Sequence, residues 1–166
     1  MKIDVKIKDY GLEKFFSDAK KLNNWKVKVG IFSGSAQGDR IHDGGITNAQ
    51  LAAIMEFGGG NNIPARPALR PTFDRERENL KKMSAKLILD VLFEGMAVEK
   101  ALGVLGAYLT AEVKKYITTG PEIPPPNTDA VRARKLAKSN GKGEPRTWID
   151  TGKLLNAFTW QVSKDK

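Results

Sequence analysis

The stretch "NNIPARPALRPTFDRERENL", residues 61–80, joins a proline-rich segment directly to a charged helical pattern. The segment interleaves three prolines with two arginines: Pro64, Arg66, Pro67, Arg70 and Pro71. Proline fixes its own φ angle and pushes the residue before it toward extended conformations. The stretch therefore predicts a rigid extended strap over residues 61–71, followed by a long helix over residues 72–93.

N-terminal to the strap, the hydrophobic pattern switches between the period of a strand and that of a helix. In chain order it predicts a strand over residues 2–8, a helix over 11–22 and a strand over 25–32. A long surface loop over residues 33–47 and a helix over 48–58 follow. Thr47 or Asn48 is suited to cap the last of these helices. That helix is expected to turn four apolar side chains inward: Leu51, Ile54, Met55 and Phe57.

C-terminal to the strap, a second long helix is predicted over residues 96–120, and Gly120–Pro121 is its stop signal. Its apolar stripe comprises Leu102, Leu105, Leu109, Val113, Tyr116 and Ile117. The glycines at 103 and 106 suggest close contact with a neighbouring helix. The chain closes with a predicted strand over residues 158–163, where apolar and polar side chains alternate.

Between the last helix and the last strand, residues 121–147 are rich in proline, then in basic residues, then in glycine. They predict a mobile excursion with at most a short helix near residues 128–138. The complete order of elements predicts an α+β fold in a single domain over residues 1–166. We expect a small, mostly antiparallel sheet of three or four strands, packed against two long helices and joined by long loops.

The composition excludes several classes of protein. The chain of 166 residues has no cysteine, which excludes a disulfide framework, a thiol nucleophile and thiolate metal ligands. The opening "MKIDVKIKDYG" has no apolar core of a signal peptide, and no run of apolar residues is long enough for a membrane span. A soluble protein of a cytoplasm is expected, and its net charge of +9 favours acidic or polyanionic partners.

No motif indicates catalysis, a metal site or a cofactor. His42 is the only histidine, and no second ligand stands at a metal-binding spacing from it. The glycines after residue 57 follow a predicted helix and lack the Lys-Ser or Lys-Thr of a phosphate loop. The carboxylates near residue 76 alternate with arginines, which is typical of an exposed, ion-paired helix face.

A basic segment over residues 132–146 forms the most charged part of the excursion. Six cations and the single acid Glu144 give it a net charge of +5: Arg132, Arg134, Lys135, Lys138, Lys142 and Arg146. Such a cluster could face DNA or an acidic partner, since lysine and arginine bind phosphates in a salt-dependent way. It contains no aromatic residue to stack on a base, and a solvated loop is the alternative.

Four motifs occur in a distinctive order: "KVKVGIF", "LAAIMEFGG", "IPARPALRPTFD" and "WIDTGKLLNAFTWQV". In this order the chain resembles the tail-completion or neck proteins of long-tailed bacteriophages, over about residues 25–163. Ala68 and Ala157 depart from the family's usual Phe and Ser. The resemblance implies a ring-forming component at the head-proximal end of the tail, where packaged DNA passes through a central channel.

The sequence "DTG" also occurs in aspartic proteases, where it lies between strands and acts with a second copy. Here Asp150, Thr151 and Gly152 precede the helical pattern "KLLNAF". We therefore expect a structural turn in which Asp150 caps a short helix.

The expected function is that of a non-enzymatic assembly protein, found in the virion and, during assembly, in the bacterial host cytoplasm. Its expected partners are other neck, tail and connector proteins, with a homo-oligomer in the virion and a monomer in isolation. The strap is the predicted interface: Ile63, Pro64, Arg66, Pro67, Leu69, Arg70 and Pro71. Within the strap, Ile63 and Leu69 would brace the core of the same subunit. Arg66 and Arg70 would contact a neighbouring subunit. A tail terminator, a head–tail adaptor and a small basic nucleic-acid-binding module are the alternatives.

Overall fold

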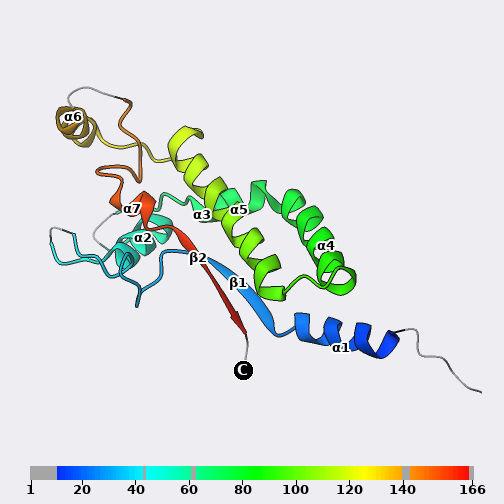
Figure 1. Cartoon of the computed structure of the whole chain (residues 1–166). Helices are drawn as coiled ribbons and strands as arrows, with labels where there is room; N and C mark the ends of the chain where they lie inside the picture. The colour runs from blue at the N-terminus through cyan, green and yellow to red at the C-terminus, as the bar shows by residue number, and fades with distance from the viewer. Residues whose placement is uncertain (1–10, 43, 61–62, 140–142, 165–166) are drawn as a thin grey trace, which may run out of the picture.

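The computed structural model describes residues 11–42, 44–60, 63–139 and 143–164. These residues form an α+β fold with seven helices and two strands (Figure 1). In chain order the elements are α1 (Leu12–Leu22), β1 (Trp25–Gly30), α2 (Asn48–Phe57), α3 (Leu69–Arg75), α4 (Arg77–Phe93), α5 (Val98–Thr119), α6 (Asp129–Lys138), α7 (Lys153–Asn156) and β2 (Thr159–Lys164). No helix in this part of the chain is long and apolar enough to cross a membrane.

The sheet is smaller than the sequence predicts, because it has two strands in the described residues rather than three or four. Strands β1 and β2 pair antiparallel, with Val27 opposite Val162 and Val29 opposite Trp160. The strand predicted over residues 2–8 lies outside the described residues. A two-stranded ribbon is marginal alone and gains stability by packing on a helix, which here is α5 (Figure 1).

Helix α5 packs against both strands at a point of close approach. Gly106 is buried, and a Cβ atom there would lie 2.6 Å from Cγ of Trp160 on β2. Only a residue without a side chain allows this contact. The predicted helix partner for Gly106 was therefore wrong, and the neighbour is a tryptophan of the sheet.

The predicted helix over residues 72–93 is divided in two. Helix α3 begins at Leu69 and ends at Arg75, and α4 begins at Arg77. Between them Glu76 has φ −87° and ψ 3°, and its side chain reaches Tyr108 of α5. Backbone hydrogen bonds from Glu76 to Thr72 and from Leu80 to Glu76 continue across this point, so the division is a local change at the residue that Tyr108 contacts.

Two apolar clusters form the core. The larger one gathers residues from α2, the end of the strap, α5 and the C-terminal third of the chain: Ala52, Ala68, Val113, Ile117, Ile123, Trp148, Leu154 and Phe158. The smaller one joins α4 to α5 through Leu87, Val91 and Ala101. The predicted stripe of α5 is confirmed at Val113 and Ile117, which are fully buried, whereas its other members are half-buried.

The predicted helices over residues 11–22 and 48–58 are confirmed as α1 and α2. Thr47 caps α2, accepting from the backbone of Gln50, whose side chain accepts in return from the backbone of Thr47. Phe57 does not face the core as expected, since 70% of it is exposed. It lies at the last position of the helix, where the chain turns away at Gly58.

Candidate interface around the proline strap

The strap is shorter than predicted. Residues 64–67 have no regular secondary structure and follow a bridge between Gly59 and Ile63, but Leu69, Arg70 and Pro71 form the first turn of α3. The backbone N–H groups of a first helical turn have no partner within the helix, so the missing N–H of Pro71 costs nothing there. The expectation of an extended segment up to residue 71 was therefore wrong for its last three residues.

Glu56 fixes the end of the strap from the inside. Its carboxylate accepts hydrogen bonds from the backbone N–H groups of Ala68 at 2.8 Å, Leu69 at 3.0 Å and Arg70 at 3.0 Å. These donors belong to the N-terminal turn of α3, where a negative charge is favourable. Glu56 is 5% exposed, so the last turn of α2 acts as a buried cap for α3.

Glu56 is not among the predicted site residues, although the sequence carries one signal for it. The buried residues of α2 are Asn48, Ala52 and Glu56, which lie four positions apart on one helix face. A carboxylate on the buried face needs hydrogen-bond donors, and the orphan N–H groups before a proline-containing helix start can supply them.

Arg66 is engaged within the chain at three points. Its backbone N–H donates to the carbonyl of Met55 at 2.6 Å, and its Nε donates to the carbonyl of Pro125 at 2.8 Å. Its own carbonyl accepts from Nε1 of the buried Trp148 at 2.7 Å. The strap is thus tied to the helix before it and to the segment after α5.

The other strap residues differ in exposure. Ile63 is 43% exposed, whereas Leu69 packs partly buried against the larger core cluster. The guanidinium of Arg70 lies 5.8 Å from the centre of the exposed Phe57 ring. A cation and an aromatic ring therefore stand together on the surface beside the start of α3.

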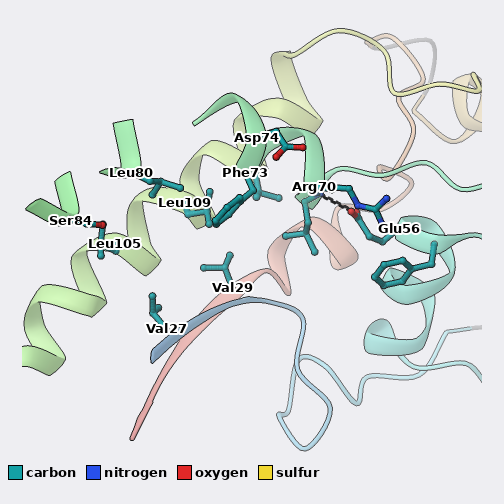
Figure 2. A pocket seen from close by; sticks show the side chains of 13 residues that line it. Val27, Val29, Glu56, Arg70, Phe73, Asp74, Leu80, Ser84, Leu105 and Leu109 are labelled. Carbon is teal, nitrogen blue, oxygen red and sulfur yellow. Dashed lines mark hydrogen bonds between the residues drawn. The ribbon is translucent and has the colours of Figure 1, made fainter. Parts of the chain in front are cut away.

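A groove of about 540 Å³ opens beside this point, as Figure 2 shows. Its walls are formed by β1, the α3–α4 pair and α5, and they are mostly apolar: Val27, Val29, Phe73, Leu80, Leu105, Leu109 and Val113. Phe73 is 51% exposed. Glu56 and Arg70 lie at one end of the groove, and Asp74 stands at the rim.

The predicted basic segment divides into two sets of contacts. On one side, Arg132 pairs with Glu122 at 3.4 Å and Glu144 at 3.5 Å. Arg146 donates to the carbonyls of Ile117 and Gly120 at the C-terminal end of α5, where orphan carbonyls need donors.

On the other side, Lys135 donates to the carbonyl of Arg146 at 2.6 Å, and Lys138 pairs with Asp150 at 2.9 Å. Arg134 is exposed, and Lys142 lies outside the described residues. The short helix predicted near residues 128–138 is confirmed as α6. The mobility of residues 121–147 stays a prediction.

The predicted turn at 150–152 is present, but Asp150 does not cap a helix. Helix α7 begins at Lys153 and its N-cap is Gly152, with φ 76°, in the left-handed region that favours glycine. Asp150 instead accepts a hydrogen bond from Lys138, and this bond holds the pKa of its carboxyl below the usual value. Asp150 therefore bonds to Lys138 of α6 and does not cap α7.

The remaining polar candidates have structural partners. His42 Nε2 makes a hydrogen bond with the side chain of the buried Asn48. Within residues 11–42, 44–60, 63–139 and 143–164, no three His, Asp or Glu side chains are grouped so that they could hold a metal ion. No protein-family model, no curated protein and no solved structure matches the chain.

Proposed function

We propose that the chain is a non-enzymatic assembly protein of a long-tailed bacteriophage, which completes the tail or joins it to the head as part of an oligomeric ring. The observation that carries the proposal is the open apolar groove beside the strap. Large exposed apolar surfaces on a folded domain commonly mark interaction sites. Three of the four motifs that resemble neck proteins contribute side chains to this groove, through β1, the end of α2 and the start of α3.

A ring of identical subunits requires two different surfaces on each subunit, which meet head to tail. The groove supplies one of them. A second apolar surface lies where α1 meets the C-terminal end of α4 (Figure 1), and we call it the α1–α4 corner: Phe16, Leu89 and Phe93, which are 59%, 54% and 66% exposed. The Phe15 ring, 5.9 Å from that of Phe93, joins the two helices there. We propose that the corner of one subunit occupies the groove of the next.

The experiment uses a phage that lacks the gene and is complemented with variants. Phe73→Lys places a charge in the groove and should give heads and tails that are not joined, or joined particles that are not infectious. The matched control is Leu136→Lys on α6, where an apolar residue that is 38% exposed lies away from the groove. Particle counts by electron microscopy and plaque titres are the measurements.

A second pair of variants tests the proposed contact itself. Phe93→Glu alone should also block assembly, whereas the double variant Phe73→Lys with Phe93→Glu should recover it in part, since opposite charges would meet. Normal infectious virions without the protein would contradict the assembly function. Full complementation by Phe73→Lys would contradict the role of the groove but not the assembly function.

The tail terminator and the head–tail adaptor remain alternatives of the same kind, and the position of the defect in the particle separates them. A nucleic-acid-binding module is the alternative of a different kind. It predicts DNA affinity that falls with salt and depends equally on the basic residues of α6. Arg132 pairs with Glu122 and Glu144, whereas Arg134 has no ion pair in the described part of the chain. Equal losses of DNA affinity on replacing either arginine would favour that alternative.

A further inference from the structure

A second cavity, of about 420 Å³, lies on the strap side of α6. It is lined by α2, the strap, α6 along its whole length, and α7 with the turn before it, and we call it the α6 pocket. Its floor is apolar, with Leu51, Met55 and the buried Trp148. Its volume falls within the range of about 300–1,000 Å³ that is usual for small-ligand sites.

The walls of the α6 pocket are strongly basic. Five cations line it together with the carboxylate of Asp150: Arg66, Arg134, Lys135, Lys138 and Lys153. Burial lowers the pKa of Lys135, and the nearby charges of Arg134, Arg66 and Lys138 lower it further, while Asp150 opposes them. One carboxylate therefore leaves an excess of positive charge in a partly enclosed space, where repulsion is weakly screened.

The cations differ in how far they are already engaged. Lys138 holds Asp150, while Lys135 and the Nε of Arg66 donate to backbone carbonyls. Arg134 and the exposed Lys153 make no hydrogen bond or ion pair within the part of the chain that the structure describes. Of these two, the guanidinium of Arg134 offers several directed donors to a ligand, whereas the ammonium of Lys153 is a point charge.

Two further groups of donors lie at the same pocket. The Nδ2 of Asn127 is buried and has no hydrogen-bond partner among the described residues. Next to it, Thr128 is the N-cap of the ten-residue helix α6 and makes no side-chain cap. A buried donor without an acceptor is costly, and an uncapped helix N-terminus attracts negative charge. Both groups would be satisfied by an anion that accepts several hydrogen bonds.

We infer that the α6 pocket binds a phosphate group. Phosphate combines multiple acceptor oxygens with a charge that matches the excess of cations, and guanidinium groups bind it with directed hydrogen bonds. The source is either a free phosphate compound or a phosphodiester of nucleic acid, which share this chemistry. The inference does not depend on the proposed assembly function, because it concerns the isolated subunit.

The test compares two arginines of the same helix. Arg134→Gln and Arg132→Gln remove the same charge two residues apart, but Arg132 pairs with Glu122 and Glu144 outside the α6 pocket. Calorimetric titration with pyrophosphate at fixed ionic strength should give about a tenfold weaker Kd for Arg134→Gln, the loss of one charged hydrogen bond. Arg132→Gln should stay within about twofold of the wild type, since it changes only a distant charge.

A third variant is expected to act in the opposite direction. Asp150→Asn removes the carboxylate that occupies Lys138 and should tighten pyrophosphate binding several-fold. A misfolded variant could not gain affinity, so this result separates a ligand effect from a folding defect.

Competition by a short DNA duplex against bound pyrophosphate identifies the source. If the duplex competes with the wild type and with Arg132→Gln but not with Arg134→Gln, the site binds a nucleic-acid phosphate. If the duplex does not compete with the wild type, the site binds a free phosphate compound. Equal losses in both arginine variants, no binding of either probe by the wild type, or binding of a glutamate-rich peptide alone would overturn the inference.

Discussion

Glu76 connects α3, α4 and α5 through a single carboxylate. It accepts from the Tyr108 hydroxyl at 2.6 Å and the Asn79 amide at 2.8 Å, and it pairs with Arg75 at 3.1 Å. These hydrogen bonds, of which the one from Tyr108 contributes most, lower the pKa of Glu76 from 4.5 to about 2. The charged form is therefore strongly preferred in the folded state.

This pKa predicts how stability depends on acid. Because the folded pKa lies below the unfolded value, the contribution of Glu76 is present above about pH 4.5 and is lost as the pH falls toward about 2. Glu76→Gln should lower the free energy of unfolding at neutral pH and flatten its fall over that window. Urea denaturation at a series of pH values measures both effects. The exposed Glu78→Gln should keep the wild-type slope, and parallel curves for Glu76→Gln and wild type would contradict the role of Glu76.

Gly106 gives a second prediction at the scale of one residue. Gly106→Ala would place Cβ within 2.7 Å of Cβ of Trp160, which lies close to the backbone and cannot swing away. We expect it to destabilise the protein by about 1–3 kcal/mol, as overpacking does. Gly103→Ala is the matched control, since its nearest neighbour is Trp160 Nε1 at 3.9 Å. It should stabilise the helix by up to about 1 kcal/mol. Equal thermal unfolding of the two variants would show that the contact with Trp160 is not tight.

At the scale of elements, the strap and α3 depend on a charge that another helix provides. Glu56→Gln keeps the size of the side chain but removes its charge and one acceptor oxygen from three N–H donors. The expected loss is about 2 kcal/mol of unfolding free energy. Hydrogen exchange should also speed up at Ala68, Leu69 and Arg70, while the amides between β1 and β2 keep their protection.

The control for this variant is Glu144→Gln, because the side chain of Glu144 is 84% exposed in its ion pair with Arg132. An exposed ion pair contributes little, so its loss should leave stability nearly unchanged. Unchanged exchange at the start of α3 in Glu56→Gln would contradict the capping role of Glu56.

The elements themselves were largely predictable. Helices α1, α2, α5 and α6 and strands β1 and β2 follow local periodicity and local end signals such as Thr47 and Gly120. The errors occur where a distant side chain intervenes. Tyr108 contacts Glu76 where the predicted helix is divided, and Glu56 accepts hydrogen bonds from the turn of α3 that begins before Pro71. Asp150 pairs with Lys138 and does not cap a helix.

At the scale of the whole molecule, three surfaces are separate. The apolar groove is lined by β1, the end of α2 and helices α3–α5, the α1–α4 corner lies at the C-terminal end of α4, and the α6 pocket is lined by other residues, on α2, the strap, α6 and α7. Phe73→Lys should therefore leave pyrophosphate affinity unchanged, and Arg134→Gln should leave the groove intact. An assembly defect and a binding defect can be assigned to different surfaces for this reason.

The sequence by itself determined the class of fold, the position of most elements, the proline strap and the excess of positive charge. These features depend on periodicity, on backbone restriction by proline and on composition, which are all local or additive. Only the tertiary structure decided that Glu56 holds the strap, that Gly106 receives Trp160, and that the basic segment divides between the end of α5 and the α6 pocket. Each of these is a contact between residues far apart in the chain, and its partner is chosen by packing, on which the spacing of residues along the sequence carries no information.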